Sequence, residues 1–231
     1  MNKYVSKALV LVATALFASG AFAQKSGSQS APGPWYIGVG IGESDASIPT
    51  RTIDVANAQL STAIGATSTI VNKDNRSTDT KIFVGYTVNR HFAAELGYAY
   101  LGQTQFTSDF RAGAPITTSL GTFNMKYKMS AFYLDAVGTL PLGETWSLLG
   151  RVGIAYSQAR AVFEGQNVTL FASTDDTKES KIYAKFGAGV NYNINAAFLA
   201  RAEWERYKLP DPLSDEKFNV DAVTLSILYR F

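Results

Sequence analysis

The sequence has little of what most enzyme sites and small exported domains use. Its 231 residues contain no cysteine and one histidine, His91. Without cysteine, no disulfide can hold the fold together, and zinc sites built from cysteine and histidine ligands are excluded. A single histidine at a predicted short turn leaves no suitable base for a serine hydrolase. We therefore predict that the protein is not an enzyme and has no catalytic residues, no metal site and no cofactor.

A strong net charge and long apolar runs are also missing. The formal net charge of +2 argues against a nucleic-acid partner. The mean hydropathy is -0.01, and the first apolar run, Ala8 to Ala18, is shorter than the roughly 18 residues that a membrane helix needs. Lys3 and Lys7 precede this run, and Ala21 to Ala23 follows it. This pattern predicts a cleaved signal peptide over residues 1–23, and hence an exported protein.

What the sequence does have is aromatic residues and alternation. It contains 12 Tyr, 14 Phe and 3 Trp. In the last stretch, large apolar residues occupy every second position, and the positions between them are mostly small or polar. The large residues are Val223, Leu225, Ile227, Tyr229 and Phe231. Because side chains on a strand point alternately to opposite faces, this stretch predicts a strand with one apolar face.

Eight segments share this alternation and are predicted strands. They are residues 35–43, 81–88, 92–101, 125–140, 146–162, 180–192, 198–208 and 218–231. Short turns alternate with four long loops, which are Ser44 to Thr80, 103–124, 164–179 and 209–217. We predict an all-β fold over residues 35–231: an eight-stranded antiparallel up-and-down transmembrane β-barrel. Residues 24–34 are expected to form a flexible periplasmic leader. The alternative fold is a soluble β-sandwich, which the outward aromatic residues disfavour.

Short motifs recur at the predicted strands and turns. They are Trp35-Tyr36-Ile37-Gly38, Gly85-Tyr86-x-Val88-Asn89, Ala94-Glu95-Leu96-Gly97-Tyr98, Leu149-Gly150-Arg151-Val152-Gly153, Gly187-Ala188-Gly189-Val190-Asn191-Tyr192, Arg201-Ala202-Glu203-Trp204 and Tyr229-Arg230-Phe231. In order and spacing they resemble the OmpA-type eight-stranded domain of the outer-membrane β-barrel family. The resemblance implies the outer membrane of a Gram-negative bacterium, with lipid and lipopolysaccharide as neighbours. It also implies that Tyr229 and Phe231 form a signal for the barrel assembly machinery. No peptidoglycan-binding domain is expected after the barrel.

Charged side chains occupy the inward faces of the predicted strands. They are Glu95, Asp135, Arg151, Lys185, Arg201, Glu203 and Glu205. An eight-stranded barrel is just wide enough for its own side chains, so these charges must pair or hold water. The resemblance likewise implies an interior salt-bridge network, with Glu95 and Arg201 at matching positions. Asn191 stands where relatives often have an acid, which leaves the pairing open. The network is either a plug or a gate whose ion pairs exchange to open a narrow path.

The expected function follows from these predictions. We expect an integral outer-membrane protein with a structural and surface-interaction role, whose barrel anchors and displays four extracellular loops. Ser44 to Thr80 is the largest loop and the expected contact for an extracellular partner. The alternative is a narrow porin-like channel for ions or small solutes, gated by the interior salt bridges. Asp175, Asp176 and Glu179 are expected to be a solvated part of the third loop rather than a cation site.

Overall fold

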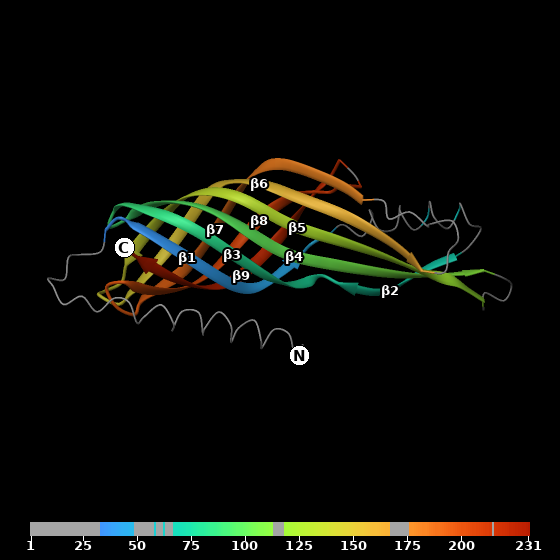
Figure 1. Ribbon diagram of the computed structural model, residues 1–231, viewed down its shortest axis with the longest axis horizontal. Coiled ribbons are helices and arrows are strands. Elements are labelled where there is room, and N and C mark those ends of the chain that lie inside the picture. The colour runs from blue at the N-terminus through green and yellow to red at the C-terminus, as the bar shows by residue number, and fades with distance from the viewer. Residues whose placement is uncertain are drawn as a thin grey trace. The chain divides into compact units, whose positions relative to one another are not determined.

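The fold is an all-β barrel, shown in Figure 1. The computed structural model describes residues 33–48, 58, 62, 67–112, 118–166, 176–213 and 215–231. The predicted signal peptide and most of the predicted leader lie outside these residues. In the described part of the chain, no helix is long and apolar enough to cross a bilayer. Its strands are β1 (Trp35–Ala46), β2 (Thr67–Asp74), β3 (Arg76–Asn89), β4 (Phe92–Ala112), β5 (Thr118–Pro141), β6 (Trp146–Gln166), β7 (Asp176–Asn193), β8 (Phe198–Pro210) and β9 (Lys217–Arg230).

Eight of these strands close into an antiparallel barrel. From β3 to β9 each strand pairs with the next, and β1 closes the barrel by pairing with both β3 and β9. β2 is not part of the closed wall. It pairs with β4 from Asp74 opposite Gln105 onward, beyond the point where β3 begins its pairing at Thr80 opposite Tyr100. The predicted eight-stranded antiparallel barrel is therefore confirmed, with β2 as an extension beside it.

The register fixes the width of the barrel. Starting at Trp35, successive cross-strand partners are Tyr86, Ala94, Ala136, Val152, Phe186, Arg206, Asp221 and Asp45. One circuit thus returns to β1 at Asp45, ten residues (45 minus 35) beyond Trp35. Eight strands with this stagger are inclined by about 40° and enclose a space that side chains can fill.

The two ends of the barrel differ in their connections. Residues 89–92, 141–146 and 193–198 make tight turns at one end, where the pairing of Tyr36 with Arg230 also places the start of β1 and the end of β9. We call this the short-turn end and the opposite one the long-loop end. The three short turns lie where the alternation predicts them.

The long connections are shorter than predicted, which corrects the loop boundaries. β1 continues to Ala46, and β2 and the start of β3 lie within the predicted loop Ser44 to Thr80. Most of the predicted loop 103–124 belongs to β4 and β5, and pairing also extends into the loops 164–179 and 209–217. Backbone pairing continues past the last outward apolar residue, because hydrogen bonds between strands do not require lipid. Residues 49–57, 59–61 and 63–66 lie outside the described residues.

On each strand, the apolar residues that face outward form a row, which we call the outward apolar ladder. The length of this ladder differs around the barrel. It covers eleven residues on β6, from Trp146 to Tyr156, and eleven on β7, from Tyr192 to Ile182. Within the strands it covers only seven residues on β8, from Phe198 to Trp204, and seven on β9, from Tyr229 to Val223, and Phe231 follows β9 at the short-turn end. The apolar face of the wall is therefore shorter on β8 and β9 than on β6 and β7.

An ion pair lies directly beyond the last outward apolar residues of β8 and β9. Arg206 on β8 donates two hydrogen bonds of 2.7 Å to the carboxylate of Asp221 on β9. Its guanidinium also lies 5.4 Å from the ring centroid of Trp204. β8 pairs with β7 only as far as Arg206, opposite Phe186, whereas β7 pairs with β6 up to Asp176. The wall is thus taller at β6 and β7 than at β8.

Glycines on the inner face make room for aromatic rings. Gly38 lies opposite Phe83, and Gly85 lies opposite Tyr36. A Cβ atom at either glycine would overlap the ring across from it. The Tyr36 and Phe83 rings meet edge to face, with centroids 6.5 Å apart. Close approach of these rings to the backbone is therefore the reason for glycine at both positions.

Candidate functional site

Among the residues that the structure describes, nine charged side chains meet inside the barrel and form what we call the interior charge network. They are Asp79, Lys81, Glu95, Asp135, Arg151, Lys185, Arg201, Glu203 and Glu205. Each has at most 5% of its surface exposed. Five carboxylates therefore face four cations in a space that is almost closed to water.

Arg151 on β6 is the centre of the network. Its guanidinium forms ion pairs with Glu95 on β4 and with Glu205 on β8, the latter at 2.8 Å. It also lies 3.3 Å from Glu203 and 3.5 Å from Asp135. One side chain thus links carboxylates from three other strands across the barrel.

The two lysines occupy neighbouring positions in the same network. Lys185 lies 2.7 Å from Asp135 and 2.6 Å from Glu205. Its ammonium group also lies 4.1 Å from the ring centroid of Tyr133, a cation–π distance. Lys81 on β3 pairs with Glu203 and, at 2.6 Å, with the second oxygen of Glu205. Glu205 is therefore shared by both lysines and Arg151.

Arg201 marks the border of the network toward the short-turn end. Its Nη1 donates to Glu95 at 2.6 Å, and its Nε donates to the side-chain oxygen of Asn191 at 2.9 Å. Tyr36 donates its hydroxyl proton to the same Glu95 oxygen at 2.7 Å. The amide group of Asn191 donates to Ser147 at 3.3 Å. Glu95 is thus shared by Arg151, Arg201 and Tyr36.

The structure brings together all the charged residues predicted to face inward. They are Glu95, Asp135, Arg151, Lys185, Arg201, Glu203 and Glu205. Their proposed role, structural or gating, stays a prediction.

Sequence reasoning missed three members or partners of the network: Asp79, Lys81 and Tyr36. Lys81 is the first residue of a predicted strand whose neighbour Ile82 faces outward, so the alternation itself could have placed it inside. Asp79 fell in the predicted loop Ser44 to Thr80. It accepts a hydrogen bond of 2.9 Å from the hydroxyl of Thr224. For Tyr36, the only indication in the sequence was its inward position in the alternation of the predicted strand.

Apolar side chains close the interior above the network, at the long-loop end. This apolar cap consists of Leu101, Phe106, Met125, Tyr127, Met129, Tyr207, Leu209, Phe218 and Val220, each 3% exposed or less. The ring of Tyr127 lies edge to face with Phe106 and Phe218, at centroid distances of 6.1 and 6.3 Å. Its hydroxyl is 3.2 Å from the carboxylate of Asp211. The cap fills the barrel between the charges and the long-loop end.

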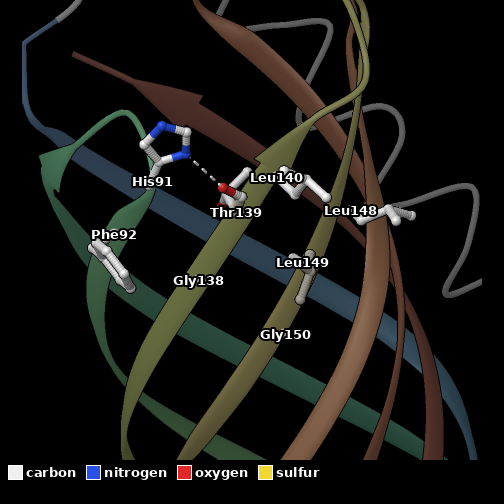
Figure 2. A pocket seen from close by; sticks show the side chains of 8 residues that line it. All are labelled: His91, Phe92, Gly138, Thr139, Leu140, Leu148, Leu149 and Gly150. Atoms are coloured by element: carbon white, nitrogen blue, oxygen red, sulfur yellow. Dashed lines mark hydrogen bonds between the residues drawn. The ribbon is translucent and has the colours of Figure 1, made fainter.

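His91 lies away from the network, beside a dent in the outer surface that Figure 2 shows. The dent has a volume of about 540 Å³ and lies where Gly138 and Gly150 face each other across β5 and β6. The Nδ1 atom of His91 is 3.2 Å from the carbonyl oxygen of Thr139. Among the described residues, the dent is lined by no serine and no carboxylate, and the contact of His91 with Thr139 is to the backbone oxygen.

The remaining sequence predictions concern metals and the assembly signal. No three His, Cys, Asp or Glu side chains converge as metal ligands among the described residues. Tyr229 and Phe231 both lie exposed on the outer surface, with ring centroids 6.1 Å apart. Their role as an assembly signal remains a prediction.

Comparisons with known proteins give one family and several similar folds. The family described as the OmpA-like transmembrane domain matches residues 31–231. No curated protein matches the sequence. Among solved structures, the attachment invasion locus protein Ail of Yersinia pestis, in complex with the heparin analogue sucrose octasulfate, is 18% identical over 85% of this chain and 99% of its own, with a TM-score of 0.46. Neisserial surface protein A is 11% identical over 87% and 100%, with a TM-score of 0.48. The N-terminal β-barrel domain of Pseudomonas aeruginosa OprF is 12% identical over 87% and 99%, with a TM-score of 0.44.

Proposed function

Because this chain belongs to the family of OmpA-like transmembrane domains, we propose that its barrel is a closed, non-enzymatic anchor that presents its long connections at the cell surface. The protein is an eight-stranded barrel of the outer membrane of a Gram-negative bacterium. In such barrels the short turns face the periplasm and the longer loops face outward. The short-turn end is accordingly periplasmic and the long-loop end extracellular. An extracellular partner that contacts the segment between β1 and β3 belongs to this proposal.

The filled interior is the observation that carries the closed anchor. Eight of the nine charges of the network form ion pairs, Asp79 accepts a hydrogen bond from Thr224, and water has almost no access to any of them. The apolar cap lies between these charges and the extracellular end. An ion on this route would have to separate buried pairs and then enter apolar surroundings, and each step costs several kcal/mol.

A gated channel is the second candidate. Glu205 accepts hydrogen bonds from Lys81, Lys185 and Arg151, and Glu95 accepts from Arg151 and Arg201. Shared carboxylates of this kind could exchange partners with little motion, which favours a gate over independent pairs. The apolar cap favours the plug.

Single-channel conductance separates these two functions. The chain from Gln24 to Phe231, beginning at the predicted first mature residue, would be refolded into a planar bilayer beside Glu95→Gln and Arg201→Gln. The closed anchor predicts no steady openings in the unmodified protein. Steady openings whose conductance changes in either variant would establish the channel function and rule out the closed anchor.

A row of cations supports lipopolysaccharide as the lipid partner. Lys128, Arg160 and Lys178 lie side by side on β5, β6 and β7, and all three are exposed. Arg160 pairs with Asp176, which leaves an excess of positive charge. Each cation lies four residues beyond the last large apolar residue of its outward ladder, Phe132, Tyr156 or Ile182. This is the level of the anionic headgroups, so we propose that the row binds lipopolysaccharide phosphates.

This contact can be tested through stability. Lipopolysaccharide that binds the folded barrel should raise its resistance to unfolding. In the double variant Lys128→Gln, Lys178→Gln we expect most of that gain to disappear, as measured by urea unfolding in vesicles with and without lipopolysaccharide. Lys181→Gln, on the opposite face of β7, is the matched control and should keep the gain. If lipopolysaccharide raised the stability of all three proteins equally, this row of cations would not be its binding site.

A further inference from the structure

The periplasmic mouth of the barrel holds a cavity whose charges are all of one sign. The cavity has a volume of about 530 Å³ and is lined by inward residues of the wall together with residues of the short turns. Three arginines line it, Arg90, Arg201 and Arg230, and among the described residues no carboxylate does. We call this cavity the vestibule.

Arg230 is the side chain that makes the vestibule unusual. It lies on β9 opposite Tyr36, is half-buried, and donates one hydrogen bond of 3.0 Å to the side-chain oxygen of Asn193. Within the described part of the chain it forms no ion pair. Burying part of a guanidinium group without an anion costs free energy, because its charge is then neither fully hydrated nor compensated.

The floor of the vestibule contributes a second guanidinium group, that of Arg201. Arg201 is 5% exposed and lines the cavity, but its carboxylate partner Glu95 also pairs with Arg151. Glu95 is thus shared by two guanidinium groups, although Arg151 also has Asp135, Glu203 and Glu205 within ion-pair distance. The other four carboxylates of the network are held by the lysines, by Arg151 or by Thr224. Glu144, in a short turn, is exposed and does not line the cavity.

We propose that the vestibule binds a phosphate group between Arg230 and Arg201. Two guanidinium groups call for an anion with two negative charges or several acceptor oxygens, and the planar fork of arginine matches phosphate in particular. The hydroxyl of Ser147, which also lines the cavity, is a further donor. The mouth opens beside the aromatic rim that includes Trp35 and Trp146, which is the level of the phosphates in the inner leaflet. The phosphate thus belongs either to a lipid headgroup or to a soluble periplasmic compound.

Binding can be measured with inorganic phosphate as the probe. The protein is refolded in an uncharged detergent, and the side-chain Nε resonances of Arg230 and Arg201 are followed by NMR during a phosphate titration. We expect saturable shifts of both resonances. In Arg230→Gln the affinity should fall at least tenfold, the loss of about one charge-assisted hydrogen-bonded pair. Arg206→Gln removes a cation on the other side of the barrel wall and should bind as the unmodified protein does.

Two results of this titration would overturn the proposal. One is the absence of any saturable shift in the unmodified protein, and the other is equal affinity in Arg230→Gln. If Arg230→Gln does not fold, Arg230→Lys keeps the charge but not the planar fork. It should bind phosphate more weakly than the unmodified protein, and unchanged binding in it would also contradict the proposal.

The source of the phosphate is decided in lipid nanodiscs. If a headgroup occupies the site, the Arg230 resonance lies at its bound position in discs that contain phosphatidic acid before any phosphate is added. If the ligand is soluble, the resonance shifts only during the titration. Both results support the vestibule as a phosphate site, whereas a resonance that moves in neither case overturns it.

Discussion

Arg151 is the residue on which the interior charge network depends. It lies within ion-pair distance of four carboxylates, and its side chain is fully buried. A buried ion pair adds little net stability compared with an apolar core, but removing one partner leaves a charge without compensation. Arg151 is therefore needed for stability only because the buried carboxylates around it require a cation.

The change Arg151→Met should destabilise the barrel by about 3–5 kcal/mol, because four carboxylates lose a shared cation. Urea unfolding in lipid vesicles measures this. Arg160→Met is the control, since the pair with Asp176 is exposed above the apolar band and should contribute less than about 1 kcal/mol. Adding Glu205→Gln to Arg151→Met should restore part of the loss. Equal destabilisation by the two arginine changes would contradict this account.

At the scale of the strands, alternation predicts which face a residue occupies but not where a strand ends. Glu95 and Arg201 were placed inside from parity alone, and the structure has both there. Phe106 fell in a predicted loop although it belongs to β4 and to the apolar cap. Beyond the aromatic rim the pattern inverts, because outward positions meet water and apolar residues turn inward. A search for outward apolar residues therefore ends the strands too early: β4 continues to Ala112, eleven residues beyond Leu101.

Strand pairing also makes a prediction about glycine. At Gly85 a methyl group would overlap the ring of Tyr36, whereas at Gly150 nothing lies within 4 Å of it. Gly85→Ala should cost about 1–3 kcal/mol through overpacking. Gly150→Ala should be neutral or slightly stabilising, because alanine restricts the unfolded chain. The two free energies of unfolding in the same vesicles test this, and a neutral Gly85→Ala would show that the Tyr36 ring moves freely.

The final strand makes a prediction about assembly. Phe231 is 56% exposed and extends the outward ladder of β9 beyond Tyr229. If the assembly machinery reads this aromatic end, Phe231→Ser should lower the amount of protein in the outer membrane and raise its degradation in the periplasm. Phe198→Ser, which changes a neighbouring ring on β8, controls for loss of a rim aromatic. Normal outer-membrane levels of Phe231→Ser would place the signal elsewhere.

At the scale of the whole molecule, the interior is divided along the barrel axis. The vestibule opens at the short-turn end, the charge network follows, and the apolar cap lies toward the long-loop end. Each layer has a different chemistry, so each can serve a different purpose. The surface role and the proposed phosphate site are therefore independent, and loss of one should leave the other intact.

The unequal outward ladders have a consequence for the lipid. With a rise of about 3.3 Å per residue and an inclination of about 40°, eleven residues cover about 25 Å, the usual height of the apolar band. Seven residues cover only about 15 Å. Arg206 and Asp221 would then sit among acyl chains beside an upright barrel. A rigid barrel answers such a mismatch by leaning and by thinning the bilayer on its short side.

Removing the ion pair as a unit tests this consequence. The double variant Arg206→Leu, Asp221→Leu lengthens the short ladders without leaving a lone charge. The lipid chain length that gives the greatest stability should shift toward longer chains, as measured by unfolding in a series of vesicles. The same double change at Arg160 and Asp176, above the apolar band, should leave the optimum where it was. An unchanged optimum in the first variant would mean that the barrel stands upright, whereas a shift would make the membrane beside β8 and β9 its thinnest and most easily disturbed border.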